Sequence, residues 1–294
     1  MSPAPLGSGA GELEDLEALL RRDPGGRGLA ALAAPGLAAA ARELLTARRA
    51  VVLSGFLVRR TPASDDLVPE TDGPPGARAL GAALAALGAE VRYLTDPGCA
   101  PLFQALGCAP LSVLDWVAGD PETPARARAA LADWAPTHVV AIERPGRAAD
   151  GRCWSMAAAE LRVAALDELL LAARAAGVAT VAIGDGGNEA GLGGLRALTV
   201  GLPHGERIAT VVPADHALAA GVSTWGAYVL VAALSRLAGR DLLPSDEAAR
   251  RDHEAIAAAG AVDGVSRAVG ITVDGRPWEE TLALLRDARA CLGG

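Results

Sequence analysis

The sequence predicts a three-layer α/β/α fold built on a doubly wound, mostly parallel sheet. Short apolar runs that suit buried strands alternate with longer segments of helical periodicity, a pattern typical of parallel α/β proteins. Hydrophobic residues make up 51% of the 294 residues but aromatic residues only 3%, so Ala, Leu and Val must fill the core. Because the composition neither shifts sharply nor repeats, we predict one domain over residues 1–294, with residues 1–48 as a helical segment packed on it.

The periodicity places helices and strands in an alternating order. The predicted helices cover residues 12–22, 29–48, 77–87, 163–176, 225–237, 247–259 and 278–291. The predicted strands cover residues 50–54, 91–95, 138–142, 178–183 and 208–212. Residues 113–131 are interrupted by Gly119 and Pro121, so we assign them to a short strand or turn followed by a helix.

Local signals justify the first of these elements. Leucines recur at helical spacing within residues 12–22. Pro74 and Pro75 mark the start of the helix over 77–87, where a missing N–H costs nothing, and Gly88 marks its end. This helix connects two strands in the manner of a crossover, which implies that the strands pair in parallel.

Charge and residue usage exclude several classes of protein. The 27 basic and 35 acidic residues give a net charge of −8, which argues against non-specific binding of nucleic acid. The chain contains no lysine, so pyridoxal enzymes, class I aldolases and Walker-type phosphate loops are excluded. Any cationic group that binds a ligand must therefore be an arginine, whose planar fork suits carboxylates and phosphates. The four cysteines lack metal-site spacing and are interpreted as reduced thiols.

The sequence carries no targeting or membrane signal that we can identify. Residues 1–11 are rich in Pro, Gly and Ser and lack the basic start and apolar centre of a secretory signal. No later run reaches the ~20 apolar residues that a membrane span needs. We therefore predict a cytoplasmic protein with no membrane partner. The sequence leaves its oligomeric state open, a homo-oligomer included.

A glycine-rich acidic loop is the strongest local signal for a site. The apolar strand over 178–183 runs directly into Gly-Asp-Gly-Gly-Asn-Glu at 184–189. Glycines at this point let backbone N–H groups approach a ligand closely, while Asp185, Asn188 and Glu189 stand at the carboxyl end of the strand. The simpler interpretation is a turn in which Asp185 caps a helix, but a cap does not need three polar groups and the six glycines found over residues 184–194.

Polar residues also follow the other predicted strands at their carboxyl ends, where ligands bind in open α/β sheets. These residues are Arg59, Arg60, Asp96, Glu143, Arg144, Arg147, Asp185, Asn188, Glu189, Asp215 and His216. Asp72, on the turn over 71–76, is expected to reach the same edge. Arg144 and Arg147 could pair with substrate carboxylates. Asp185 and Glu189 could bind an ammonium group or a divalent cation, or relay a proton.

The remaining candidates for substrate contact come from the same loops and from one helix start. They are Ser54, Gly55, Thr71, Glu143, Gly186, Gly187, Asn188, Ser223 and Trp225. Trp225 begins a predicted helix whose N–H groups could face an anion.

Two familiar motifs were tested against these loops. The segment 184–189 is like the acidic loop of haloacid-dehalogenase phosphatases, but the first strand, which ends at 53–56, lacks the DxD that this superfamily needs. A dinucleotide fingerprint is absent after that strand. A metal-dependent phosphohydrolase and a non-catalytic module that binds an amino acid or nucleotide stay open as alternatives.

Several longer segments together resemble the D-glutamate cyclase family, in particular the module that forms the C-terminal half of animal mitochondrial cyclases and also occurs as a freestanding bacterial protein. The segments that carry the resemblance are residues 54–56, 70–76, 142–151, 183–193, 214–216, 222–228 and 262–264. They extend over nearly the whole chain. Ala190 and Leu192 stand where larger aliphatic residues or methionine are expected, and Ser155 and Met156 follow an altered context.

The resemblance implies a hydro-lyase that closes D-glutamate to 5-oxo-D-proline with loss of water. On that basis Arg144 and Arg147 are expected to bind the substrate carboxylates, and Asp185 or Glu189 to receive the amine proton. Asp72, or a divalent cation such as Mg²⁺ or Mn²⁺ bound by Asp72, Asp185 and Glu189, is expected to polarise the γ-carboxyl group. The expected partner is a small amino dicarboxylate.

Overall fold

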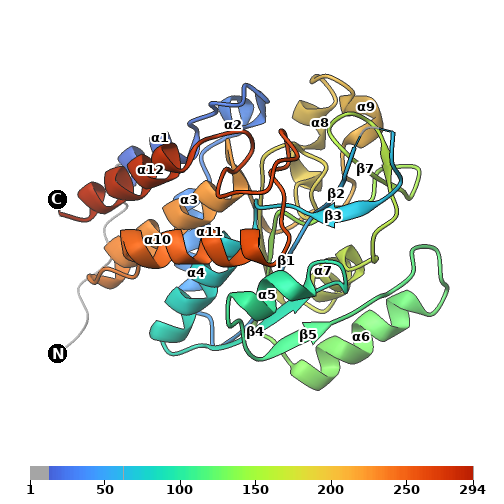
Figure 1. The fold of residues 1–294 in the computed structure, drawn as a ribbon. Helices are drawn as coiled ribbons and strands as arrows, with labels where there is room; N and C mark the ends of the chain where they lie inside the picture. Colours follow the sequence, from blue (N-terminus) through green and yellow to red (C-terminus); the bar gives the residue numbers. More distant parts are fainter. Residues whose placement is uncertain (1–12, 62, 294) are drawn as a thin grey trace.

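The computed structural model describes residues 13–61 and 63–293, and its central sheet holds six parallel strands (Figure 1). They are β1 (Arg49–Ser54), β4 (Glu90–Thr95), β5 (Leu111–Val113), β6 (His138–Ile142), β9 (Ala179–Gly184) and β10 (His216–Ala219). The strands lie side by side in the order β10-β9-β6-β1-β4-β5. Numbered along the chain and read from β5, this is the 3-2-1-4-5-6 order of doubly wound, Rossmann-type sheets. The predicted fold class is confirmed.

Helices cover both faces of the sheet, as Figure 1 shows. On one face lie α1 (Glu14–Leu20), α3 (Leu37–Leu44), α4 (Pro74–Ala86), α5 (Ala100–Ala105), α10 (Ser223–Ala238), α11 (Asp246–Ala258) and α12 (Trp278–Ala290). On the other lie α2 (Leu29–Leu32), α6 (Thr123–Trp134), α7 (Asp167–Ala175) and α8 (Arg196–Thr199). Successive residues of β1 alternate between the two cores, because side chains of a strand point to opposite faces: Val52 packs in one core, Val51 and Leu53 in the other.

Smaller elements complete the chain. Two antiparallel hairpins pair β2 (Leu57–Arg59) with β3 (Leu67–Pro69), and β7 (Cys153–Trp154) with β8 (Glu160–Leu161). The short helices are α9 (Gly205–Ile208), η1 (Gly193–Leu195) and η2 (Cys291–Gly293).

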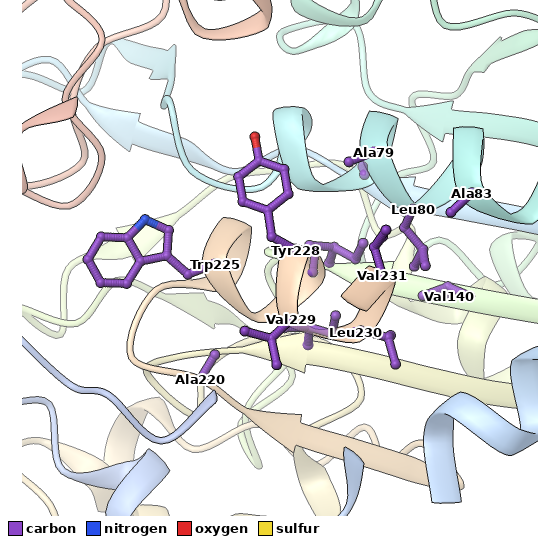
Figure 2. Packing of buried hydrophobic residues seen from close by; sticks show 14 of the residues in the cluster. Ala79, Leu80, Ala83, Val140, Ala220, Trp225, Tyr228, Val229, Leu230 and Val231 are labelled. Atoms are coloured by element: carbon purple, nitrogen blue, oxygen red, sulfur yellow. The ribbon is translucent and has the colours of Figure 1, made fainter. Parts of the chain in front are cut away.

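Helix α10 is the centre of the thicker helical layer. All of its residues from 223 to 235 are buried, as expected for a helix that is apolar all round. Figure 2 shows Ala79, Leu80 and Ala83 of α4 facing the side chains of α10, with Val140 of the sheet beside them. The close approach of the two helices positions the start of α10 beside the turn that precedes α4.

Two predicted elements differ from the structure. The helix predicted over 29–48 is divided into α2 and α3, because Pro35 cannot donate a backbone hydrogen bond and Gly36 favours a break. The strand predicted over 208–212 is wrong: only Thr210 in this segment makes an isolated bridge, to Ala148, and the edge strand is β10, a few residues further on.

The shifted strand moves two candidate residues away from the expected edge. Asp215 and His216 stand at the amino end of β10, where Asp215 accepts hydrogen bonds from the backbone N–H and hydroxyl of Thr180 and from Arg174. His216 faces Glu43, with 3.8 Å between Nε2 and Oε2. The prediction that this pair belongs to the site is therefore wrong.

The features predicted for residues 1–11 lie outside the described part of the chain. Within the described part, no helix has both the length and the apolarity needed to cross a membrane.

Candidate active site

Three buried carboxylates meet at the carboxyl edge of the sheet. Asp72 lies in the turn before α4, Glu143 follows β6, and Asp185 follows β9. One carboxylate oxygen from each lies within 4.8 Å of those of the other two. The strand order reverses between β1 and β6, and at such a switch point loops diverge to opposite faces and leave room for a ligand. We refer to Asp72, Glu143 and Asp185 as the carboxylate trio.

Asp72 is bound by the amino terminus of α10. Its carboxylate accepts hydrogen bonds from the backbone N–H groups of Ser223 at 3.0 Å and Thr224 at 2.7 Å, and from that of Gly73 at 2.9 Å. The positive end of a helix dipole favours a negative charge there. Burial nevertheless raises the pKa of Asp72 to about 7, and the charge of Asp274 adds to the shift.

Glu143 is held in a strained backbone conformation. Its φ of +42° lies in the left-handed region, which costs energy for a side chain other than Gly. The hydroxyl of Ser223 donates to its Oε2 at 2.5 Å. Burial raises the pKa of Glu143 well above its ordinary value, and the charges of Glu189 and Asp72 raise it further. Glu143 thus lies at the same edge as Asp72 and Asp185, and Ser223 contacts Glu143 and Asp72. Its predicted contact with substrate stays a prediction.

Asp185 has one oxygen in an ion pair and one oxygen free of protein partners. Its Oδ1 contacts the guanidinium of Arg27, from the loop between α1 and α2. Its Oδ2 is buried and has no hydrogen-bond partner among the described residues. A buried oxygen without a partner costs roughly 1–3 kcal/mol, so this atom is poised to accept from a ligand.

Glu189 closes the glycine-rich loop upon itself. Its Oε1 accepts from the backbone N–H groups of Asp185 and Gly186, and its Oε2 accepts from that of Gly187, at 2.8–3.1 Å. Glu143, rather than Glu189, therefore completes the group within reach of one ion. The roles predicted for Glu189, as base and metal ligand, stay predictions. The hydrogen bonds show that Glu189 supports the loop.

Two further acidic residues border the trio. Glu70 and Asp274 are 5% and 8% exposed, and burial raises the pKa of each. The strip over 69–71 is joined to the segment between α11 and α12 by backbone hydrogen bonds, and Thr71 Oγ1 donates to the carbonyl of Thr272 at 2.7 Å. Thr71, predicted as a substrate contact, thus ties the segment carrying Asp274 to the site.

Arg27 is the cationic side chain at this cluster that the sequence did not reveal. It contacts Asp185, and its Nη2 lies 2.9 Å from Asp274 Oδ2. Burial alone would lower the pKa of Arg27, but the charges of Asp274 and Glu143 raise it. Arg27 follows no predicted strand, so only the folded arrangement places it at the site.

The two arginines predicted to bind substrate are engaged with the protein itself. Arg144 is fully buried; it pairs with Asp96 and donates to the carbonyls of Gly55 and Ala164. Arg147 makes a bidentate pair with Asp167, at 2.7 and 2.9 Å. These contacts correct the prediction: both guanidinium groups stabilise the loops around the site rather than face the trio.

The other candidates divide between the site and the core. The hydroxyl of Ser54 is buried without a partner among the described residues. Asn188 donates to the carbonyl of Trp154, and its Oδ1 is without a partner in the described part of the chain. Trp225 lies in the core, where its indole N–H donates to Thr281 Oγ1 at 2.9 Å, so its predicted substrate contact is wrong.

A cavity of about 790 Å³ lies beside the site and is bordered by Asp96, Arg147 and Asp167. None of the trio lines it. We therefore place the candidate reacting centre at the trio and not in the cavity. The trio holds the two carboxyl groups with raised pKa values, Asp72 and Glu143, and the oxygen without a partner, Asp185 Oδ2.

Comparison with known proteins gives two findings. Residues 16–289 match the model of the family described as D-glutamate cyclase-like, C-terminal. The human protein named D-glutamate cyclase, mitochondrial, is 33% identical over 326 aligned positions, which cover 94% of this chain and 51% of the human one. The chain thus spans about half the length of that relative.

Proposed function

The chain belongs to the D-glutamate cyclase-like family, and from that premise we propose that it is a hydro-lyase that converts D-glutamate to 5-oxo-D-proline and water. The substrate is taken from the name of the human relative. The observation that supports this activity is the buried trio of Asp72, Glu143 and Asp185, with the guanidinium of Arg27 in contact with Asp185.

The reaction has a simple balance of atoms. The α-ammonium group loses two protons, its nitrogen bonds to the carbon of the γ-carboxyl group, and one oxygen of that group leaves with two protons as water. The site must therefore take protons from nitrogen and deliver protons to oxygen, while it reduces the negative charge of the γ-carboxylate.

The geometry supports a division of these tasks. In our proposal Arg27 binds the γ-carboxylate and withdraws its charge, which makes the carbon a better electrophile. Asp185 accepts a proton from the ammonium group through Oδ2, the atom that has no partner among the described residues. Glu143, whose pKa burial raises, delivers one proton to the departing oxygen. The proton that Asp185 took first returns to Glu143, and Asp185 then passes the second proton from the nitrogen to the same oxygen.

Product formation tests the proposal directly. The purified chain is incubated with D-glutamate and, separately, with L-glutamate, and 5-oxoproline is measured by chiral chromatography. We expect 5-oxo-D-proline from the D-enantiomer. No product from either enantiomer would overturn the proposal, and phosphate release from a generic ester would favour a phosphohydrolase instead.

A variant pair assigns the activity to the trio. Asp185→Asn keeps the shape of the side chain but cannot accept the proton, so turnover should fall at least ~100-fold. Asp133→Asn removes an exposed carboxylate from α6 and should leave turnover unchanged. Equal turnover of the two variants would remove Asp185 from the chemistry.

A further inference from the structure

We propose that Asp72, Glu143 and Asp185 form a binding site for one divalent cation of the Mg²⁺ and Mn²⁺ class, and that Arg27 competes with this ion for Asp185. The inference rests on the proposed function only for what the ion would do in the reaction. Ion binding itself can be measured without turnover.

The first argument is the set of ligand atoms. Three carboxylates each offer one oxygen, all within 4.8 Å of one another. Adjacent oxygen ligands of an octahedral Mg²⁺ lie about 2.9 Å apart, given metal–oxygen distances of about 2.0–2.1 Å. The three oxygens would therefore have to move closer together to form one face of such a site. Carboxylate oxygens are the ligands that hard divalent cations prefer.

The second argument concerns two buried atoms without hydrogen-bond partners, one of which lies outside the trio. Asp185 Oδ2 and Ser54 Oγ are both completely buried and have no hydrogen-bond partner among the described residues. A Cβ atom added at Gly73 would lie 2.9 Å from Ser54 Oγ and 2.7 Å from Glu143 Cβ, so this hydroxyl stands beside the trio. Buried polar atoms in native proteins usually have a partner, and an ion with its bound water would supply one.

The third argument is that the trio is fixed before any ion arrives. Three backbone N–H groups orient Asp72, and the Ser223 hydroxyl orients Glu143. Each carboxylate oxygen has two lone pairs, so an oxygen that accepts one hydrogen bond can still bind a cation. These hydrogen bonds orient Asp72 and Glu143 before an ion binds, which reduces the rearrangement that the near-octahedral geometry of Mg²⁺ requires.

The fourth argument is that the protein already places a cation here. The Arg27 guanidinium contacts Asp185 and lies 2.9 Å from Asp274. Arg27 belongs to the loop between α1 and α2, and its side chain is partly exposed. Asp23 stabilises that loop by accepting from the backbone N–H groups of Arg27 and Gly28. Two positive charges at one carboxylate repel each other, so loss of the guanidinium should strengthen ion binding.

Binding of Mn²⁺ to the chelator-treated full chain tests the site, with free Mn²⁺ measured by electron paramagnetic resonance. We expect one ion per chain. Asp185→Asn and Glu143→Gln should each weaken binding at least tenfold, and Arg27→Gln should tighten it severalfold. The exposed Asp133→Asn variant should bind as the wild type does, which separates the site from adventitious surface binding.

Thermal unfolding supplies a second measurement that does not depend on activity. Mn²⁺ should raise the melting temperature of the wild type and of Arg27→Gln but not that of Asp185→Asn, because only an ion that binds the folded state stabilises it. A folded Asp185→Asn variant is recognised by its own cooperative transition.

The site is overturned if neither the wild type nor Arg27→Gln binds Mn²⁺ saturably, or if the Asp185 and Glu143 variants bind as tightly as the wild type. These results are distinct from a failure of the proposed function. Mn²⁺ binding without 5-oxoproline formation leaves the cation site and removes the activity. Full turnover in the presence of chelator, without Mn²⁺ binding, removes the cation site and leaves the activity.

Discussion

Gly73 is the residue on which the geometry of the trio depends most directly. Its φ is +97°, and an added Cβ would lie 2.7 Å from Glu143 Cβ and 2.9 Å from Ser54 Oγ. Gly73→Ala should therefore displace Glu143 and lower turnover at least tenfold, in addition to about 1–3 kcal/mol of backbone strain. Steady-state kinetics and denaturant unfolding measure the two effects.

Gly88 provides the matched control for that substitution. It has nearly the same φ, +98°, but nothing lies within 4 Å of an added Cβ. Gly88→Ala should lose a similar amount of stability and keep full turnover. If both variants lose activity equally, the effect of Gly73→Ala is due to strain alone and not to contact with Glu143.

The ion pair of Arg144 and Asp96 offers a second prediction at the level of residues. Both side chains are buried, so Asp96→Asn leaves a buried guanidinium without its counter-charge. The free energy of unfolding should fall by about 3–5 kcal/mol. The pair of Arg126 and Glu122 is exposed, and Glu122→Gln should change stability by less than about 0.5 kcal/mol. Urea unfolding at neutral pH compares the two, and equal losses would contradict the prediction.

Single residues also show what the sequence could and could not reveal. Asp185 and Glu143 were predicted because each follows an apolar strand, and Asp72 because it lies on a turn that the chain marks clearly with glycine and proline. Arg144 and Arg147 were predicted because they follow a strand at the expected edge and because guanidinium groups suit carboxylates. Position along the chain does not show that Asp96 and Asp167 engage their donors. Arg27 and Asp274 reach the trio only through tertiary packing, which no local pattern records.

At the level of elements, the contact between α4 and α10 connects core packing to the site. A Cβ atom added at Gly76 would lie 2.8 Å from Ala227 Cβ and 3.0 Å from Thr224 Cα. Gly76→Ala should separate the two helix starts, and with them Asp72 and Ser223, so both stability and turnover should fall. Intrinsic propensity alone predicts the opposite sign, a gain of up to about 1 kcal/mol.

Ala82, on the exposed side of α4, measures the propensity term by itself. Ala82→Gly should destabilise by up to about 1 kcal/mol and leave turnover unchanged. A stabilising effect of Gly76→Ala in thermal unfolding, without loss of turnover, would show that the two helices can separate freely and that their contact does not position the site.

The predicted helices and strands were accurate where a local pattern decides the structure, and inaccurate where long-range pairing decides it. Long helices and buried strands were located because their periodicity is strong, as in α12 and β6. The edge strand β10 was misplaced because the apolar run before it resembles a strand, whereas pairing with β9 begins only at His216. Strand pairing is a long-range property, and an apolar run alone does not specify it.

At the scale of the whole molecule, the strand order explains why distant segments meet. The loops after β6 and β9 reach the same edge of the sheet as the turn before α4. The strand order reverses between β1 and β6, and this reversal separates the loops on either side of the trio. The sequence predicted a parallel, doubly wound sheet but not its strand order. The order depends on which helices cover which face, and that is decided by packing.

The pH dependence of global stability gives the last prediction, through His253. This side chain is fully buried beneath α12; its Nε2 lies 3.3 Å from Tyr228 Oη, and its ring packs on Trp278. Burial lowers the pKa of His253 from 6.5 to about 4. Between these values the unfolded chain binds a proton that the folded chain does not, so the stabilisation present above pH 6.5 is lost as the pH falls towards 4. The loss amounts to about 3 kcal/mol over this window.

Urea unfolding between pH 7 and pH 4 tests this linkage in the wild type, in His253→Gln and in His204→Asn. Gln cannot take up the proton, so the stability of His253→Gln should fall less steeply with decreasing pH, by up to about 1.4 kcal/mol per pH unit. His204 is exposed, and its left-handed backbone is one that Asn tolerates, so His204→Asn should follow the wild-type curve. Parallel curves for all three proteins would mean that His253 gains its proton in the folded state, and that the core around α11 and α12 admits water.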